Sequence, residues 1–98
     1  MNEEEVRRRI ADGQSAAELL NLADPKLRRR FQRAAQTLAR LMEDVQSHFP
    51  DAEYYTAGGG LTLLLGRSHR DEGTHTVSQR EMVADVAMNG LIIGDGDW

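Results

Sequence analysis

The chain has 98 residues, of which 40% are hydrophobic and 29% charged, and its formal net charge at pH 7 is −4. This length and balance are typical of one globular domain and exclude a disordered chain. The absence of cysteine excludes disulfides, thiolate metal sites and thiol nucleophiles. No run approaches the roughly 18 apolar residues of a membrane span, so we expect a cytoplasmic protein without a membrane contact. We predict a single domain over residues 1–98.

Two short helices are predicted in the N-terminal segment, residues 1–24. In Glu3–Asp12 the acids precede the arginines, which is the order that the helix macrodipole favours, and Gly13 can cap the end. Ser15 stands three residues before Glu18, as in a capping box, and good helix formers follow it. Both signals are local, so they predict helices without reference to the rest of the fold.

The main helix is predicted over residues 25–49. Asp24 and Pro25 supply an N-cap and a first-turn proline, and Pro50 ends the helix. Apolar residues recur at steps of three and four along this segment, which indicates an amphipathic helix with one apolar face. We expect that face to be buried against a sheet through Leu27, Phe31, Leu38, Leu41 and Val45.

An antiparallel sheet is predicted over residues 52–98. The β-prone runs 53–56 and 61–65 flank three glycines, Gly58 to Gly60, which read as a hairpin turn and not as a phosphate loop. The polar segment 67–76 is expected to be a mobile surface loop. The predicted fold is therefore α+β, with N-terminal helices and one long helix packed on a four-stranded antiparallel sheet.

Residues 77–88 fit two structures. Ser78 and Glu81 match a capping box, which favours a helix. The alternation from Met82 to Met88 leads into Asn89-Gly90, a favoured hairpin turn, and Leu91-Ile92-Ile93 follows. We favour strands here, and these two runs complete the four strands.

The polar loop also holds the only candidates for metal or catalytic chemistry. His69, Asp71 and His75, with Glu72 among them, are residue types that bind divalent metals, but their spacing matches no established site. Ser68, His69 and Asp71 are the residue types of a hydrolytic triad, yet neighbours in a flexible loop do not converge as a triad must. We therefore predict no catalytic residues, no metal, no cofactor and no enzyme activity.

A basic stripe is the most distinctive charge feature of the sequence. Residues 1–50 hold nine basic and eight acidic groups, whereas residues 51–98 hold three basic and eight acidic groups. On a helix Arg29, Arg33 and Arg40 share one face, which could follow the phosphates of a nucleic acid. The net negative charge and the lack of stacking aromatics on this face favour contact with a protein instead.

The C-terminal residues offer a second candidate for partner binding. The chain ends in Asp95, Gly96, Asp97 and Trp98, the last of which is its single tryptophan. Tryptophan is enriched at interface hot spots, so Trp98 flanked by Asp95 and Asp97 could anchor a partner. The alternative is that the ring folds back to cover a small core.

A resemblance adds to this interpretation over about residues 38–98. The runs Leu41–Val45 and His48–Ala52, the segments Leu61–Leu63 and Gly66–His69, and the closing Gly96-Asp97-Trp98 resemble short uncharacterised bacteriophage and prophage proteins. The resemblance implies an accessory protein that binds a host protein, as anti-CRISPR proteins and other defence inhibitors do.

We therefore expect a non-catalytic protein-interaction protein, with a phage-encoded inhibitor of a host protein as its specific form. The first alternative is a small nucleic-acid-binding or regulatory protein that uses the basic helix face, and the second is a small metal-dependent enzyme. The partner-binding residues that we predict are Arg29, Arg33, Arg40, Asp95, Asp97 and Trp98. The sequence leaves a homodimer open.

Overall fold

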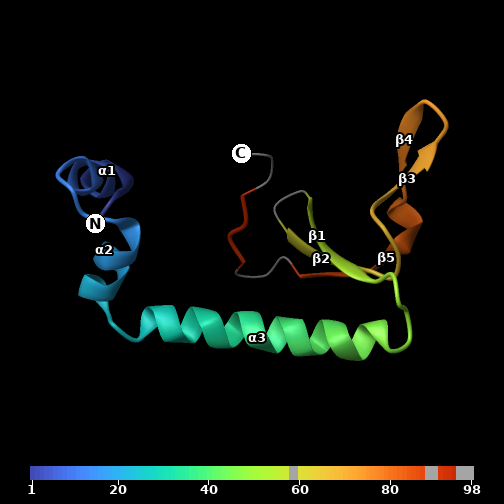
Figure 1. Cartoon of the computed structure of the whole chain (residues 1–98), viewed down its shortest axis with the longest axis horizontal. Coiled ribbons are helices and arrows are strands. Elements are labelled where there is room, and N and C mark those ends of the chain that lie inside the picture. The colour runs from blue at the N-terminus through green and yellow to red at the C-terminus, as the bar shows by residue number, and fades with distance from the viewer. Residues whose placement is uncertain (58–59, 88–90, 95–98) are drawn as a thin grey trace. The chain divides into compact units, whose positions relative to one another are not determined.

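A computed structural model describes residues 1–57, 60–87 and 91–94, and its elements are labelled in Figure 1. The helices are α1 (Glu3–Ala11), α2 (Ala16–Ala23), α3 (Leu27–Gln46) and the short 3₁₀ helix η1 (Arg80–Met82). The strands are β1 (Glu53–Ala57), β2 (Gly60–Leu64), β3 (His69–Glu72), β4 (His75–Ser78) and β5 (Val83–Ala87). The chain divides into two units, Met1–Ala39 and Arg40–Trp98. A single domain over the whole chain stays a prediction.

Local capping explains the first two helices, and both are confirmed. The Asn2 side chain accepts a hydrogen bond from the backbone N–H of Glu5 at 2.9 Å, so Asn2 begins α1. The chain leaves α1 through Gly13, whose φ of +104° favours glycine. Ser15 Oγ accepts from the Glu18 N–H at 3.1 Å, which is the capping bond that the sequence predicts for α2.

Removal of the Ser15 cap gives a measurable prediction. We expect Ser15→Ala to lower the free energy of unfolding by about 1 kcal/mol, because the Glu18 N–H then loses its acceptor. Ser15→Asp keeps an acceptor at the N-cap and serves as the control, with little or no loss expected. Urea denaturation followed by circular dichroism compares the variants, and equal midpoints for Ser15→Ala and the wild type would show that the cap contributes nothing.

The long helix is confirmed, but its expected burial is wrong. Asp24 Oδ1 accepts from the Lys26 N–H at 2.9 Å, so Asp24 acts as an N-cap, and α3 ends at Gln46, shortly before Pro50. No residue of α3 is buried. The predicted core positions are half-buried or exposed: Leu27 and Val45 are half-buried, and Phe31, Leu38 and Leu41 are 74%, 38% and 48% exposed. A regular apolar stripe predicts an amphipathic helix. It does not predict which segment covers the apolar face, or whether any does.

The second unit is built around a three-stranded antiparallel sheet in the order β1-β2-β5. Strand β2 is central, with Tyr54 opposite Leu63 on one side and Thr62 opposite Val86 on the other. Alternate residues of β2 are buried, and Thr62 and Leu64 are only 6% and 2% exposed. Ala52, 3% exposed, lies just before β1. The buried part of this unit is therefore small and centred on β2.

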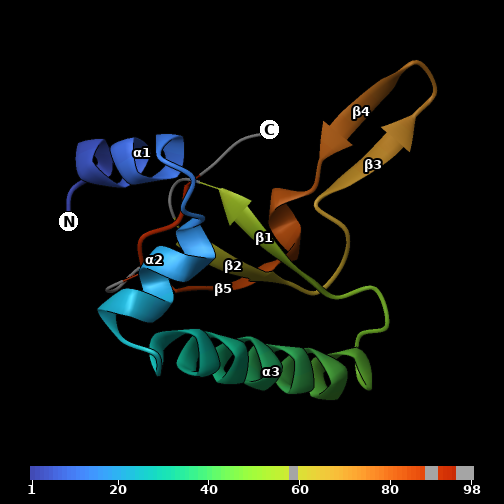
Figure 2. The same ribbon diagram turned by 60° about the vertical axis from the view of Figure 1, so that its left-hand side comes forward.

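The predicted α+β class is confirmed, but the single four-stranded sheet is replaced by two antiparallel sheets of three and two strands. The segment that we expected to be a mobile loop contains the β3–β4 hairpin, with His69 opposite Ser78 and Glu72 opposite His75. Gly73 makes its tight turn possible with a φ of +69°. Figures 1 and 2 both show this hairpin extending away from the three-stranded sheet. Its residues are almost all exposed, so the apolar alternation that marks a strand is missing from its sequence.

The ambiguous segment 77–88 contains the end of one strand, a short helical turn and a second strand. Val77 and Ser78 end β4, Arg80–Met82 form the 3₁₀ helix η1, and Val83–Ala87 form β5, so strand is confirmed on both sides of the helical turn. The N–H of Leu65 donates to the carbonyl of Met82 at 2.9 Å and continues the pairing beyond β2. Residues 91–93 form no strand, which corrects the prediction for that run. The predicted turn at Asn89-Gly90 and most of the glycine loop, Gly58-Gly59, lie outside the described residues.

Candidate functional site

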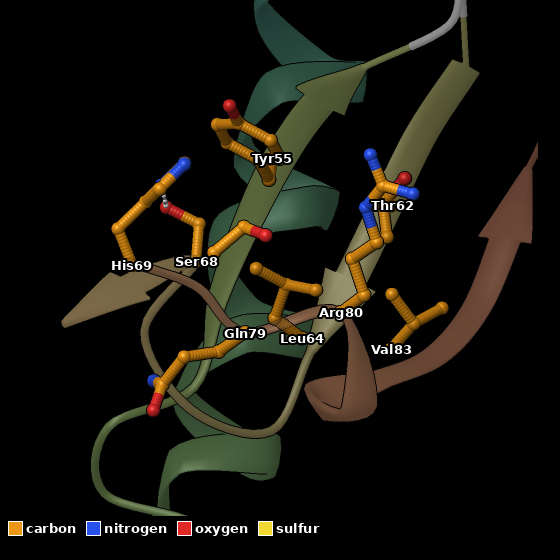
Figure 3. A pocket seen from close by; sticks show the side chains of 9 residues that line it. Tyr55, Thr62, Leu64, Ser68, His69, Gln79, Arg80 and Val83 are labelled. Carbon is orange, nitrogen blue, oxygen red and sulfur yellow. Dashed lines mark hydrogen bonds between the residues drawn. The ribbon is translucent and has the colours of Figure 1, made fainter. Parts of the chain in front are cut away.

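A small cavity lies beside the buried face of the three-stranded sheet. It has a volume of about 220 Å³ and is lined by Tyr55, Thr62, Leu64, Ser68, His69, Ser78, Gln79, Arg80 and Val83. Figure 3 shows Tyr55, Ser68 and His69 on one side of it and Arg80 and Val83 on the other. Pockets for drug-sized ligands and cofactors usually span about 300–1,000 Å³. The cavity therefore supports at most a small molecule.

Two members of the sequence-suggested triad do meet at this cavity. The Nδ1 atom of His69 lies 3.0 Å from Ser68 Oγ, and the imidazole ring lies edge-on to the ring of Tyr55. The backbone N–H of Ser68 donates to Glu53 Oε1 at 2.8 Å, which fixes the start of the hairpin against β1. Asp71 does not join them, since its carboxylate is within 3.5 Å of the Thr76 hydroxyl instead. Among the described residues no carboxylate bonds to His69 to orient the imidazole.

The hairpin register separates the metal-ligand candidates. Successive side chains of a strand point to opposite faces, so His69 and Asp71 share one face of β3. His75 pairs with Glu72, which puts it on the other face of the hairpin. Within residues 1–57, 60–87 and 91–94, no group of three or more metal-binding side chains comes together.

This separation predicts the response to metal. We expect an equimolar amount of Zn²⁺ to leave the melting temperature of the wild-type protein unchanged, because His69 and His75 cannot ligate one ion from opposite faces. His75→Ala is the matched control and should respond in the same way. A rise in melting temperature that the wild type shows and His75→Ala loses would contradict the register argument.

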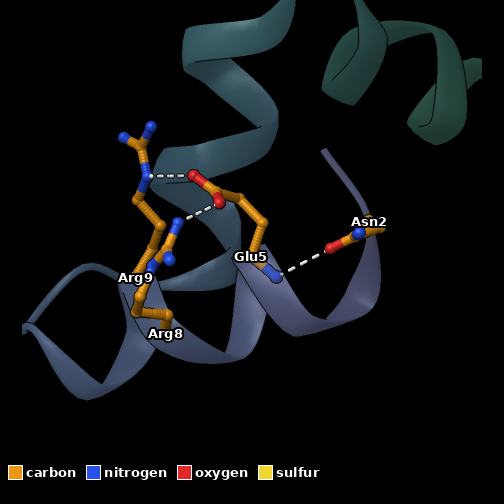
Figure 4. Close-up of polar contacts among 4 residues, drawn as sticks. All are labelled: Asn2, Glu5, Arg8 and Arg9. Carbon is orange, nitrogen blue, oxygen red and sulfur yellow. Dashed lines mark hydrogen bonds and ion pairs between the residues drawn. The ribbon is translucent and has the colours of Figure 1, made fainter.

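The arginines of α1 form ion pairs within their own helix. Figure 4 shows the Glu5 carboxylate accepting from Arg8 and, at 3.3 Å, from Nε of Arg9. Arg7 pairs with Glu3 at 3.4 Å one turn earlier. Such pairs between residues three or four apart stabilise a helix by about 0.2–0.5 kcal/mol each. All three arginines of α1 therefore have a structural explanation.

The arginines of α3 have no such partners among the described residues. The helix carries Arg28, Arg29, Arg30, Arg33 and Arg40, and all five are exposed. Not one of them forms an ion pair with a described carboxylate. The steps of four, three and four from Arg29 through Arg33 and Gln36 to Arg40 place these four residues on one side of the helix. We call Arg29, Arg33, Gln36 and Arg40 the arginine face.

The order of charges along α3 is also the reverse of the order that a helix favours. In α1 the first turn is acidic and the last turn basic, whereas α3 has no acid in its first turn and no base in its last. Three arginines lie at its N-terminal end, and Glu43 and Asp44 lie near its C-terminal end. Each misplaced charge costs about 0.3–1 kcal/mol through the helix macrodipole. A sequence that breaks a local rule without a structural return does so most often at a functional site.

The structure thus brings together only part of what the sequence predicts. Arg29, Arg33 and Arg40 share a face as expected, whereas Asp95, Asp97 and Trp98 lie outside the described residues and stay predictions. Sequence reasoning missed the cavity residues Tyr55, Gln79 and Arg80. They come together through the hairpin and the strand register, and no sequence motif marks them.

Comparisons with known proteins assign neither a family nor a fold relative. No protein-family model matches the chain, and no curated protein or solved structure is significantly similar to it. In the part of the chain that the structure describes, no helix is both long and apolar enough to cross a membrane.

Proposed function

We propose that this chain is a non-catalytic protein-interaction protein that binds an acidic surface of a partner protein through the arginine face of α3. The observation that carries the proposal is the contrast between the two helices. All arginines of α1 are paired with glutamates, and those of α3 have no carboxylate partner among the described residues. Guanidinium groups bind carboxylates in a bidentate manner, so a row of unpaired arginines suits an acidic protein surface.

The placement of these arginines supports a binding role over a structural one. Arg29 lies in the first turn of α3, where the macrodipole is positive, so the dipole adds to the positive potential that an approaching anion meets there. Over the 11 residues from Arg29 to Arg40 the helix rises about 16 Å. The arginine face is therefore long enough to contact several carboxylates at once on a partner surface.

The partner class that we propose is a host protein in the cytoplasm. The resemblance to small phage accessory proteins makes a defence protein one member of this class, with the chain as its inhibitor. Binding without catalysis fits the incomplete Ser68–His69 arrangement.

Nucleic acid binding is the second candidate, and the same row of exposed arginines favours it. Phosphate contacts need unpaired cations spaced along a helix face, which α3 supplies. The arginine face contains no aromatic side chain on which a base could stack. The protein partner is therefore the proposal, and nucleic acid is an outcome that its test can reveal.

Affinity capture from bacterial lysate, with and without nuclease, tests the proposal. The variant Arg29→Gln/Arg33→Gln/Arg40→Gln removes three charges from α3, and Arg7→Gln/Arg8→Gln/Arg9→Gln removes three from α1 as a matched control. We expect wild type and the α1 variant to retain the same protein after nuclease treatment and the α3 variant to lose it. Retention by both variants would reject the arginine face, and loss of all bound material with nuclease would favour the second candidate.

A further inference from the structure

The apolar stripe of α3 has the spacing of a coiled coil. Its members follow one another at steps of four, three, four, three and four, which is the a and d pattern of a heptad: Leu27, Phe31, Ala34, Leu38, Leu41 and Val45. Phe31 and Leu41 are 74% and 48% exposed, which is unusual for large apolar side chains on a regular stripe. The arginine face occupies the outer c and f positions and is separate from this stripe.

The spacing of the stripe is the same from either end of the helix, and its midpoint is at the level of Gln36. When two copies of α3 lie antiparallel about this centre, each residue of the stripe meets another member of the stripe. Phe31 lies opposite Leu41 of the second copy, and Ala34 lies opposite Leu38 of the second copy. The outermost pair is Leu27 with Val45. The pairing of a with d positions is the layer geometry of an antiparallel coiled coil, so no apolar position is left without a partner.

Charges beside the stripe select the antiparallel arrangement. In that geometry the g positions of the two helices face each other, which brings Arg30 against Asp44 of the second copy, twice per dimer by symmetry. Neither residue forms an ion pair with a described residue of its own chain. A parallel pair would place Arg30 beside Ala35 and bring both arginine-rich ends together, which is repulsive.

We propose that α3 pairs with α3 of a second copy as an antiparallel two-stranded coiled coil, centred on Gln36 and flanked by Arg30–Asp44 ion pairs. The reversed charge order of α3 then favours this pairing, because the basic end of one helix lies against the acidic end of the other. The arginine faces of both copies point away from the seam. The dimer therefore goes beyond the proposed function and leaves the partner-binding surface free.

Chemical cross-linking tests the direction of pairing, since the chain has no cysteine to interfere. In the antiparallel dimer Thr37 lies at the two-fold axis, so Thr37→Cys should link to itself with a short bis-maleimide. Gln36→Cys points outward and is the control that should not link. Arg30→Cys and Asp44→Cys should link to each other when mixed and not when alone, because the two copies of position 30 are about 18 Å apart along the axis and those of position 44 about 24 Å. Linking of Arg30→Cys or Asp44→Cys to itself would overturn the antiparallel arrangement.

Charge reversal tests the ion pairs, with sedimentation equilibrium as the measurement. We expect the wild type to approach twice the chain mass as concentration rises, and Arg30→Asp and Asp44→Arg each to shift this transition to higher concentration. The double variant Arg30→Asp/Asp44→Arg should restore it, whereas Arg33→Asp, an outer change of equal charge, should leave it unchanged. Wild-type protein with the mass of one chain at all concentrations would overturn the proposal. Partner capture by Arg30→Asp should persist, so the dimer and the proposed function can fail independently.

Discussion

Leu64→Ala is expected to lower the free energy of unfolding by about 2–5 kcal/mol, which is the cost of truncating a buried leucine. Leu64 lies on the central strand β2 and is only 2% exposed, so the substitution leaves a cavity between the sheet and what covers it. Among the described residues of this unit, Ala52 and Thr62 are buried to a similar degree.

A matched leucine gives the control for this prediction. Leu22 is 68% exposed, and Leu22→Ala should change the free energy of unfolding by no more than about 0.5 kcal/mol. Urea denaturation of both variants under the same conditions supplies the comparison. Equal midpoints for the two variants would mean that β2 does not carry the core of its unit.

Arg29→Glu is expected to stabilise the protein and to abolish partner capture at the same time. A glutamate near the N-terminal end of α3 suits the macrodipole, which contributes about 0.3–1 kcal/mol. It also replaces a repulsion with Arg33 four residues later by a favourable pair. If Arg29 serves binding and not folding, its replacement should raise the stability of the fold while partner capture is lost, as is common at functional sites.

Arg29→Gln separates the two effects, because it removes the positive charge without adding a negative one. We expect it to be intermediate in stability and to weaken capture from the nuclease-treated lysate less than Arg29→Glu does. Thermal unfolding and capture are measured on the same preparations. A variant that loses both stability and capture would instead assign Arg29 a structural role.

The helices were predictable because their signals are local. Ser15 and Asp24, the N-terminal caps that the sequence predicts, each accept a hydrogen bond from a backbone N–H within three residues, and Asn2 does the same for α1 without having been predicted. The cover of the helical stripe was not predictable in this way. Leu38 was expected in the core and is 38% exposed, because periodicity defines an apolar face without identifying its partner.

The strands were harder to predict than the helices, because one pair was missed and one apolar run was wrongly predicted as a strand. The β3–β4 hairpin has almost no buried residue, so its sequence lacks the alternation by which a strand is recognised. The run Leu91-Ile92-Ile93 is apolar enough to suggest a strand, yet it forms none, and Ile92 is fully exposed. Strand formation depends on pairing with a distant segment, which composition alone does not supply.

The candidate site also has a part that the sequence predicts and a part that only the structure shows. The arginine face follows directly from helical spacing, so its members were predictable from the sequence. The lack of carboxylate partners among the described residues appears only in the structure, as does the cavity at Tyr55 and Arg80. Both depend on where side chains of other segments come to lie.

Site-specific photocross-linking at Gln36 tests whether the arginine face binds a partner protein, because Gln36 lies within this face and carries no charge of its own. A photoreactive amino acid is placed at position 36, or at the exposed Glu81 as the control, and irradiated in nuclease-treated bacterial lysate. We expect a covalent adduct with a protein other than this chain at position 36 and none at position 81. The absence of a protein adduct at position 36, or the same adduct at both positions, would contradict it.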